Sequence, residues 1–227
     1  MKFGGIAKTS TIDFPGVLAC VLFSVGCNLD CFYCHNRPLI DGNGVLIPEE
    51  EVKQFLLRRK GLLDGVVISG GEPTLQPDLY EFCKWVKSLG YQLKLDTNGQ
   101  KLDVVRQLIE DDLVDYVAVD YKAPAAEYAK ICNGDAAKTL DTIQYLLKCK
   151  TQFEVRTTVY PALSRQGLKV LLSEVPVVPC YRLNVYRRPD VIDNRHLPLL
   201  DAPVLCKADL QAMFDTLKTI QPNLLPC

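Results

Sequence analysis

Val17-Leu-Ala-Cys-Val-Leu-Phe-Ser24 is an unbroken apolar run, and it sets the fold class expected for this chain of 227 residues. A run that does not alternate with polar residues is typical of a strand buried on both faces, as in a parallel sheet. A helix is expected after it, because Pro48 and the acids that follow suit a helix N-terminus, while Arg58-Arg-Lys60 suits a C-terminal turn. The segment therefore predicts one strand–helix unit.

The same pattern recurs along the whole sequence. Further strands are expected at residues 65–69, 91–95, 115–119, 153–160 and 181–186. Further helices are expected near residues 77–89, 102–110, 125–130, 138–148, 165–174 and 207–219. Such alternation implies a parallel sheet with right-handed crossovers. The fold class is therefore α/β, either an open partial (β/α)6 barrel of parallel strands or a flat doubly wound sheet. Since no linker interrupts the pattern, we expect a single domain over residues 1–227.

Composition excludes several classes of protein. The formal net charge is −1, so no long-range field draws the whole chain to nucleic acid or to acidic membranes. No apolar stretch approaches the ~20 residues that span a bilayer. The first residues lack the basic start and apolar core of a signal peptide, and ten cysteines without such a signal favour a reducing compartment. We therefore expect a soluble cytoplasmic protein that binds neither nucleic acid nor membrane.

Three cysteines follow the first strand, in Gly26-Cys-Asn-Leu-Asp-Cys-Phe-Tyr-Cys34. Thiolates spaced as Cys-x3-Cys-x2-Cys can hold three irons of a four-iron, four-sulfur cluster and leave the fourth iron open, whereas an electron-transfer ferredoxin ligates every iron. Structural zinc is the alternative, and it needs four ligands. His35 directly follows Cys34 and would give poor tetrahedral geometry. From spacing alone, both an open iron–sulfur cluster and zinc remain.

The other seven cysteines are isolated in the sequence and fit no disulfide framework. We expect them to be small buried apolar residues. They are Cys20, Cys83, Cys132, Cys149, Cys180, Cys206 and Cys227.

Glycines and polar or charged residues lie at the ends of the predicted strands, or within the last two of them. They are Gly70, Gly71 and Glu72 after the second strand, Asp96 after the third, Asp120 and Lys122 after the fourth, Arg156 within the fifth and Asn184 within the sixth. In open α/β sheets, ligands bind at the carboxyl ends of the strands. The charged groups could instead form a strand-end ion-pair network, and Arg156 could either clamp a ligand carboxylate or satisfy a nearby acid.

Taken in order, these motifs resemble those of the radical S-adenosylmethionine (SAM) enzymes. The cysteine motif and Gly70-Gly-Glu-Pro73 carry that resemblance. Further motifs resemble those of glycyl-radical-enzyme activases, above all the activases of anaerobic ribonucleoside-triphosphate reductase. These are Ile12-Asp-Phe-Pro-Gly16, Cys34-His-Asn36, Lys94-Leu-Asp-Thr-Asn-Gly99, Asp120-Tyr-Lys122 and Arg156-Thr-Thr158. The resemblance runs from about Gly4 to Tyr160.

The resemblance implies a 4Fe-4S cluster held by Cys27, Cys31 and Cys34, whose open iron chelates the amino and carboxylate groups of SAM. The Gly70-Gly71-Glu72 edge would bind the methionine amino end.

It further implies that the backbone from Tyr33 to His35 lies near the adenine, and that Asp120 and Lys122 reach the ribose or carboxylate. Asp96, Thr97 and Asp120 would help to hold a monovalent cation. Arg156 and Asn184 are further candidates for SAM binding, although activases often carry a histidine or glutamine where this chain has Asn184.

The reaction implied is reductive cleavage of SAM to a 5′-deoxyadenosyl radical, which removes a hydrogen atom from a glycine Cα. The partners implied are a glycyl-radical enzyme, in particular anaerobic ribonucleotide reductase, and a one-electron donor such as flavodoxin or ferredoxin. Three alternatives remain. The radical could act on a small molecule or on another glycyl-radical enzyme of the formate-lyase type, or the chain could be a metal-stabilised binding module without activity.

Overall fold

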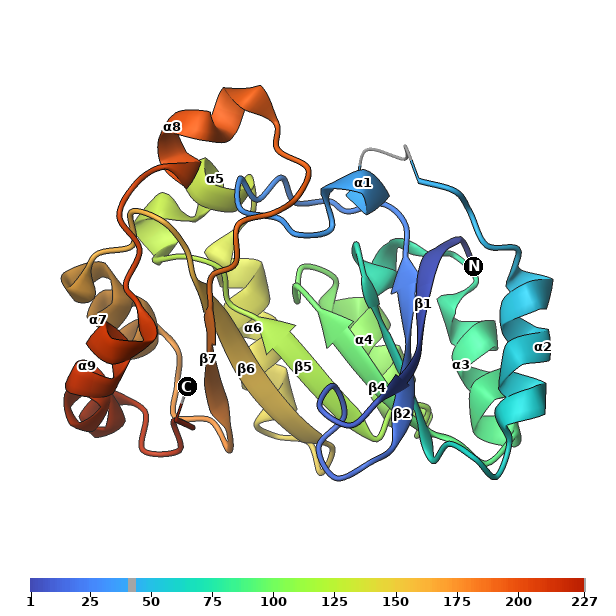
Figure 1. Ribbon diagram of the computed structural model, residues 1–227. Helices are drawn as coiled ribbons and strands as arrows, with labels where there is room; N and C mark the ends of the chain where they lie inside the picture. The colour runs from blue at the N-terminus through green and yellow to red at the C-terminus, as the bar shows by residue number, and fades with distance from the viewer. Residues whose placement is uncertain (41–43, 227) are drawn as a thin grey trace. The chain divides into compact units, whose positions relative to one another are not determined.

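The computed structural model describes residues 1–40 and 44–226. After two consecutive strands at the N-terminus, strands alternate with helices along the chain (Figure 1). The strands are β1 (Phe3–Ser10), β2 (Ala19–Ser24), β3 (Gly65–Gly70), β4 (Gln92–Thr97), β5 (Tyr116–Asp120), β6 (Gln152–Val159) and β7 (Tyr181–Val185). The α-helices are α1 (Arg37–Ile40), α2 (Glu49–Arg59), α3 (Leu79–Ser88), α4 (Leu102–Glu110), α5 (Tyr128–Cys132), α6 (Ala136–Leu146), α7 (Arg165–Glu174), α8 (Leu197–Leu200) and α9 (Lys207–Ile220). Short 3-10 turns are η1 (Pro73–Leu75), η2 (Ala125–Glu127) and η3 (Asn194–His196).

The strands hydrogen-bond in the order β1-β2-β3-β4-β5-β6-β7. The pairs β2–β3, β3–β4 and β6–β7 are parallel; in the first of them Ala19 lies opposite Gly65 and Ser24 opposite Gly70. All the predicted strands are present, with ends that differ from the prediction by about two residues at most. The predicted fold class, an α/β fold with the parallel strands of an open partial barrel, is confirmed.

β1 is an addition to that prediction. It pairs antiparallel with β2. Gly4 and Gly5 conceal the strand in the sequence, because glycine has a low strand propensity. A Cβ atom at Gly4 would lie 2.3 Å from Leu39 Cδ2. The glycine therefore lets Leu39 of α1 pack directly on the strand backbone.

The longer predicted helices are also present. The prediction for residues 125–130 corresponds to η2 followed by α5. α1 and α8 were not predicted, because a helix of about one turn is too short to show hydrophobic periodicity.

The chain forms two compact units, each described by itself. Unit 1 comprises Met1–Asn28, Pro38–Thr97 and Lys101–Ala118. Unit 2 comprises Leu29–Arg37, Asn98–Gln100 and Val119–Cys227. A single domain over residues 1–227 stays a prediction.

Each unit has its own apolar core. In unit 1 a cluster of buried side chains comprises Phe14, Ala19, Val21, Val67 and Tyr116. In unit 2, α7 and α9 contact each other. Their buried leucines are Leu168, Leu171, Leu172, Leu210 and Leu217. Burying one leucine side chain stabilises a fold by about 1.5–3 kcal/mol. The buried leucine faces of α7 and α9 are the apolar faces of the amphipathic helices that the sequence predicts.

The isolated cysteines match their prediction in part. Cys20, Cys83 and Cys132 are buried, whereas Cys149 and Cys180 are half-buried. For Cys206 the prediction is wrong, since it is exposed at the N-cap of α9, where backbone capping rather than burial places it. Cys227 lies outside the described residues.

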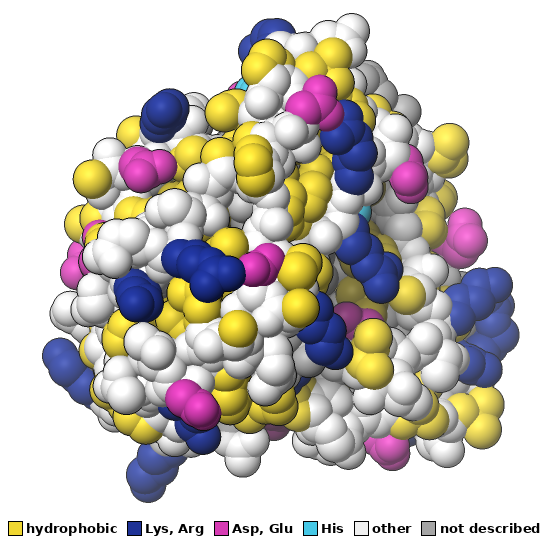
Figure 2. Space-filling view, turned by 60° about the vertical axis from the view of Figure 1, so that its left-hand side comes forward, with side chains coloured by type: hydrophobic (Ala, Val, Ile, Leu, Met, Phe, Trp, Pro, Cys, Tyr) yellow, Lys and Arg dark blue, Asp and Glu magenta, His cyan; other side chains and the backbone are white. Residues whose placement is uncertain are grey.

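The distribution of charged side chains on the surface agrees with the near-zero net charge. On the face drawn in Figure 2, lysine and arginine side chains are interspersed with aspartate and glutamate. In the described part of the chain, none of the helices has the length and apolar character needed to cross a bilayer.

Candidate functional site

The glycine edge of unit 1 follows β3 and lies against the segment that leads into Cys27. The amide of Gly71 donates to Ser24 O at 2.9 Å, and the amide of Glu72 donates to Gly26 O at 2.8 Å. A Cβ atom at Gly71 would lie 2.1 Å from Gly26 O, and Gly70 has a φ of +107°. Both positions therefore need glycine, and the edge fixes the backbone immediately before Cys27.

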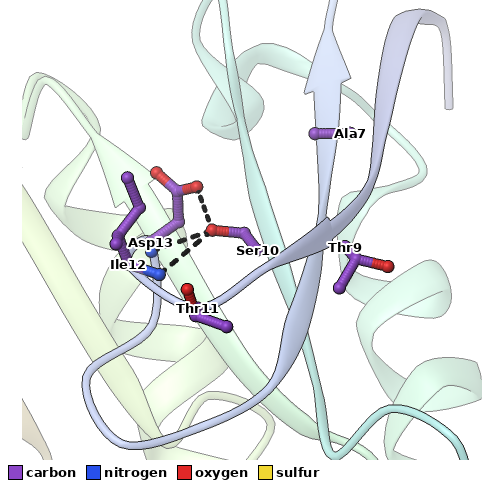
Figure 3. A pocket seen from close by; sticks show the side chains of 6 residues that line it. All are labelled: Ala7, Thr9, Ser10, Thr11, Ile12 and Asp13. Carbon is purple, nitrogen blue, oxygen red and sulfur yellow. Dashed lines mark hydrogen bonds between the residues drawn. The ribbon is translucent and has the colours of Figure 1, made fainter.

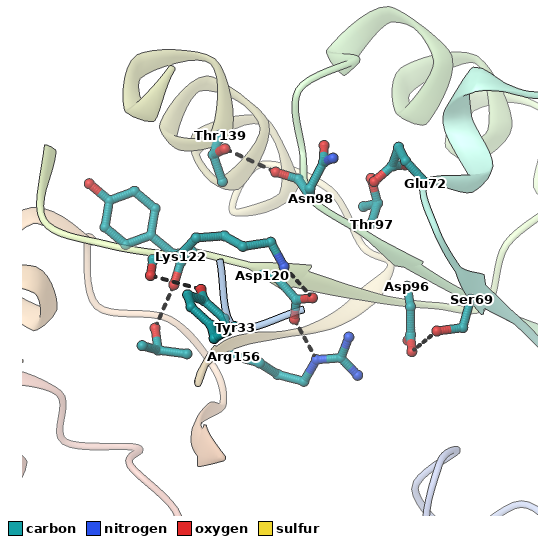
Figure 4. A network of polar contacts seen from close by, with 12 residues as sticks. Tyr33, Ser69, Glu72, Asp96, Thr97, Asn98, Asp120, Lys122, Thr139 and Arg156 are labelled. Atoms are coloured by element: carbon teal, nitrogen blue, oxygen red, sulfur yellow. Dashed lines mark hydrogen bonds and ion pairs between the residues drawn. The ribbon is translucent and has the colours of Figure 1, made fainter. Parts of the chain in front are cut away.

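Glu72 lies beneath this edge and is fully buried. Its Oε1 accepts hydrogen bonds from Thr74 N at 3.1 Å, Thr74 Oγ1 at 2.6 Å and Thr97 Oγ1 at 2.8 Å. Figure 4 shows Thr97 directed at this carboxylate. The side chain therefore caps η1 and connects it to the end of β4. The buried Glu72 side chain therefore holds the glycine edge in place.

Asp96 has an internal counter-charge. Lys94 Nζ lies 2.8 Å from Asp96 Oδ1. Ser69 Oγ donates to Asp96 Oδ2 at 3.0 Å, as Figure 4 shows. Lys94 is 1% exposed, and its Nζ also donates to Asp13 O at 2.7 Å. A role for Lys94 does not follow from the sequence, because the carbonyl that its ammonium contacts lies in a loop 81 residues away.

That loop follows β1 and borders a hollow of about 380 Å³, lined by Ala7, Thr9, Ser10, Thr11, Ile12 and Asp13 (Figure 3). Ser10 Oγ accepts from the amides of Ile12 at 3.2 Å and Asp13 at 3.1 Å, and it donates to the Asp13 carboxylate. The turn is thus closed around the Ser10 hydroxyl, while the Ile12 side chain is 87% exposed.

Unit 2 contains the rest of the cysteine loop. Cys34 N donates to Cys31 O at 3.1 Å, and Asp30 N donates to Cys132 O at 2.8 Å. A hydrogen bond with Cys132, followed by burial, raises the pKa of Cys31 well above its usual value, while the charge of Lys122 opposes that rise. Burial, followed by the nearby Cys31, raises the pKa of Cys34 to about 11. Both thiols are therefore protonated at neutral pH until a positive centre binds them.

Tyr33 anchors the loop between the two cysteines. Its ring stacks on Tyr160, with centroids 5.1 Å apart and an interplanar angle of 5°. Its hydroxyl donates to Lys122 O at 3.1 Å. His35, two residues later, is exposed.

Asp120 lies between two cations, as Figure 4 shows. Arg156 Nε lies 2.9 Å from Asp120 Oδ1, and Lys122 Nζ lies 3.0 Å from Asp120 Oδ2. Burial alone would raise the pKa of Asp120, but the charges of Arg156 and then Lys122 lower it well below its usual range. Burial alone would lower the pKa of Lys122, but Asp120, and next Cys31, raise it above its usual range. Unit 2 therefore combines the cysteine loop with a charged cluster of two cations and one anion.

Asn184 lies on the neighbouring strand. It is opposite Thr158 in the β6–β7 register, two positions beyond the pair of Arg156 and Arg182. Because side chains alternate along a strand, Asn184 and Arg156 share one face of the sheet.

The donor chemistry of the cysteine loop fits an iron–sulfur cluster. Cys27, Cys31 and Cys34 are present as thiols rather than disulfides, Cys27 in unit 1 and the other two in unit 2. Across residues 1–40 and 44–226, three His, Cys, Asp or Glu side chains are nowhere gathered as they are around a bound metal ion. Thiolates are the ligands that iron–sulfur clusters use.

Comparison with known proteins decides between the readings left open by the cysteine spacing. Residues 21–174, more than half of the chain, match the model of the Radical SAM superfamily. The chain belongs to the radical SAM superfamily. It is therefore a radical SAM oxidoreductase, and its cofactors are a 4Fe-4S cluster and S-adenosylmethionine.

Two relatives support the resemblance to glycyl-radical-enzyme activases. A Methanocaldococcus jannaschii protein assigned as a glycyl-radical enzyme activating enzyme is 33% identical over 208 residues, which cover 86% of this chain and 85% of that protein. The pyruvate formate-lyase-activating enzyme of Clostridium pasteurianum is 32% identical over 181 residues, which cover 76% of this chain and 75% of the relative. The resemblance to these activases is thereby confirmed.

Two solved structures with bound S-adenosylmethionine share the fold. Streptococcus suis SuiB bound to S-adenosylmethionine aligns with a TM-score of 0.69 at 17% identity, covering 90% of this chain and 48% of SuiB. The enzyme anSMEcpe with bound AdoMet aligns with a TM-score of 0.64 at 20% identity, covering 88% of this chain and 59% of that one.

Proposed function

We propose that this radical SAM enzyme activates an anaerobic ribonucleoside-triphosphate reductase by removing a hydrogen atom from a glycine Cα of that partner. The observation that carries the proposal is the match to glycyl-radical-enzyme activating enzymes over most of both chains. The ordered motifs from Ile12 to Thr158 support the choice of reductase as partner. A one-electron donor such as flavodoxin or ferredoxin would supply the reducing equivalent.

In this proposal Cys27, Cys31 and Cys34 hold the cluster. When bound, the cluster supplies the electron that cleaves S-adenosylmethionine to methionine and a 5′-deoxyadenosyl radical, the species that abstracts hydrogen. The residues of the chain position the cysteine ligands. The glycine edge fixes the approach to Cys27, and the stack of Tyr33 on Tyr160 fixes the loop between Cys31 and Cys34.

The charged cluster of Lys122, Asp120 and Arg156 is the proposed site for the polar groups of S-adenosylmethionine. The ammonium of Lys122 can pair with the methionine carboxylate, and Asp120 can accept from ribose hydroxyls. Because Asp120 holds both cations in place, it also orients them for the ligand. Tyr33 to His35 near the adenine, Gly70 to Glu72 near the methionine amino group, and Asn184 remain proposed contacts.

The predicted monovalent cation at Asp96, Thr97 and Asp120 also remains a proposal. Lys94 already neutralises Asp96, Thr97 donates to Glu72, and Asp120 pairs with Lys122 and Arg156.

An anaerobic assay tests the function. The reconstituted enzyme, S-adenosylmethionine and a chemical reductant are mixed with a candidate anaerobic ribonucleotide reductase, and the glycyl radical is followed by electron paramagnetic resonance. We expect a glycine-centred doublet that disappears when the reductase glycine is replaced with alanine. The Cys31→Ala enzyme should give no signal and bind little iron, whereas Cys83→Ala, which removes a buried thiol in unit 1, should behave as the wild type.

Two further arms identify other substrates. A signal with a formate-lyase type enzyme and none with the reductase would reassign the partner, in line with the Clostridium pasteurianum relative. Formation of 5′-deoxyadenosine with a small molecule alone would reject the activase proposal. The Probable GTP 3′,8-cyclase of Pyrococcus horikoshii, which is 32% identical over 41% of this chain, makes GTP the first compound to try.

A further inference from the structure

Two tyrosine hydroxyls hold the backbone of Lys122, one at its amide and one at its carbonyl. Lys122 follows β5, which ends at Asp120. Its amide donates to Tyr128 Oη at 3.4 Å, and its carbonyl accepts from Tyr33 Oη at 3.1 Å. Both tyrosine side chains are buried, whereas the Lys122 side chain is 18% exposed and its Nζ lies 3.0 Å from Asp120 Oδ2. The backbone of Lys122 is therefore fixed in the interior, while its ammonium keeps partial contact with solvent.

A buried threonine determines which way the Tyr128 hydroxyl points. Thr139 of α6 is fully buried, and its Oγ1 lies 3.1 Å from Tyr128 Oη. Thr139 Oγ1 donates to Asn98 O at 2.9 Å, as Figure 4 shows, and accepts from Gln100 Nε2 at 2.7 Å. Since a hydroxyl carries one proton, the bond between Thr139 and Tyr128 uses the proton of Tyr128. The Tyr128 oxygen then accepts from the Lys122 amide.

These bonds form a chain with one direction. The Lys122 amide donates to Tyr128, Tyr128 donates to Thr139, and Thr139 donates to Asn98 O. Hydrogen bonds linked in this way polarise and strengthen one another. Removing either hydroxyl would leave buried polar groups without a partner, which costs more than the bond itself contributes. The chain therefore opposes displacement of the Lys122 backbone.

A lysine ammonium sits on a flexible stem of four carbons, so its position is defined only when both ends of the side chain are restrained. Asp120 restrains the ammonium of Lys122, and the tyrosine hydroxyls restrain the backbone. We propose that Tyr128 and Thr139 are positioning residues for S-adenosylmethionine, which fix Lys122 so that its ammonium meets the methionine carboxylate. The inference rests on the proposed function, in which Lys122 pairs with that carboxylate.

Variants that lose a single hydroxyl test this role. Tyr128→Phe and Thr139→Val each remove one hydroxyl and keep a side chain of similar shape, whereas Thr139→Ser retains the hydroxyl. Tyr181→Phe is the matched control, because Tyr181 is also fully buried in unit 2 and its hydroxyl bonds to Thr157 at 2.8 Å. Each variant is reconstituted anaerobically, and its iron content is measured.

Equilibrium dialysis with the oxidised holoenzyme measures binding without cleavage. The probes are S-adenosylmethionine and its decarboxylated form, which lacks only the group that Lys122 would bind. We expect the Kd for S-adenosylmethionine to rise about three- to tenfold in Tyr128→Phe and Thr139→Val, the effect of losing one hydrogen bond. Thr139→Ser and Tyr181→Phe should bind it as the wild type does. The decarboxylated form should bind to all four variants with wild-type affinity.

A double-mutant cycle with Lys122→Met separates positioning from a general effect on the fold. Because Tyr128 acts through Lys122, Tyr128→Phe should add nothing to the loss of affinity that Lys122→Met causes. Additive losses in the double variant would overturn the inference, since Tyr128 would then act independently of Lys122.

The remaining outcomes distinguish this inference from the proposed function. Unchanged affinity for S-adenosylmethionine in Tyr128→Phe and Thr139→Val, with weaker binding in Lys122→Met, would reject the inference alone. Equal weakening for the two probes would show a packing role and overturn it as well. Wild-type affinity in Lys122→Met would reject the proposed contact with the carboxylate, and the inference with it. If Tyr128→Phe does not retain iron, the comparison of Thr139→Val with Thr139→Ser decides the test.

Discussion

Arg156 Nε donates to Asp120 Oδ1 over 2.9 Å, so the charge of a strand-end carboxylate is balanced from the neighbouring strand. With Lys122 on its other oxygen, Asp120 keeps two cations in fixed positions. Replacing Asp120 with asparagine preserves its shape and removes its charge. We expect the free energy of unfolding to fall by about 1.5–3 kcal/mol, the range for hydrogen bonds to charged groups, and S-adenosylmethionine to bind more weakly. Urea denaturation and equilibrium dialysis measure the two effects. Asp103→Asn, at a carboxylate that is 97% exposed, should change stability by less than about 0.5 kcal/mol.

The contribution of Asp120 to the free energy of unfolding should depend on pH. Its folded-state pKa is lowered by Arg156 and Lys122. The stability it provides is therefore complete above the unfolded pKa of about 3.9 and is lost as the pH falls further. The difference in unfolding free energy between wild type and Asp120→Asn should be constant from pH 8 to about pH 5 and shrink below about pH 4. A difference that persists unchanged in acid would contradict this account.

Lys94→Met should destabilise unit 1. The substitution leaves the mostly buried Asp96 carboxylate without its ammonium partner, and breaking a buried ion pair in this way costs about 3–5 kcal/mol. Thermal or urea unfolding measures the loss. The double variant Lys94→Met/Asp96→Leu should recover part of it, because no buried charge remains. Lys84→Met, at an exposed position of α3, is the matched control; an equal loss there would argue against the ion pair.

Gly71→Ala should disturb the approach to Cys27. The new methyl group would lie 2.1 Å from Gly26 O, so the backbone must move. Overpacking of this kind costs about 1–3 kcal/mol, and we expect less iron bound per chain after reconstitution. Gly44→Ala, whose Cβ would lie 3.9 Å from Pro38 O, should retain full iron content. Equal iron content in the two variants would show that cluster binding does not depend on the glycine edge.

Two substitutions at Tyr33 test how its hydroxyl and its ring hold the cysteine loop in place. Tyr33→Phe keeps the stack on Tyr160 and loses the bond to Lys122 O, which should cost about 1 kcal/mol. Tyr33→Leu also loses the aromatic pair, which adds about 0.5–1.5 kcal/mol. Cluster stability, measured as the rate of iron release to a chelator, should fall in the order wild type, Phe, Leu. The same rate in all three would show that the ring does not fix the loop.

The sequence predicted the strand–helix units because local patterns determine them. The apolar run at Val17–Ser24 and the amphipathic helices needed no long-range information. β1 was not predicted, because glycine has a low strand propensity; Gly4 allows Leu39 to pack on the strand, and Gly5 faces Phe23.

The site residues were predicted by type, but their contacts were not. Glu72 was expected to reach a ligand ammonium, which stays a prediction; the hydrogen bonds that it accepts from Thr74 and Thr97 were not predicted. Cys132 was expected to be a small buried residue and is buried, but the hydrogen bond from Asp30 N to its carbonyl was not predicted. The bonds from Thr97 to Glu72 and from Asp30 to Cys132 join segments far apart in the chain and follow from tertiary packing, which local patterns do not encode.

The ammonium of Lys94 has a consequence for how the enzyme responds to its medium. Asp96 is neutralised by a covalently tethered cation, whose local concentration does not depend on the salts dissolved around the protein. The Asp96 carboxylate and its counter-charge are thus parts of the same chain and are inherited together.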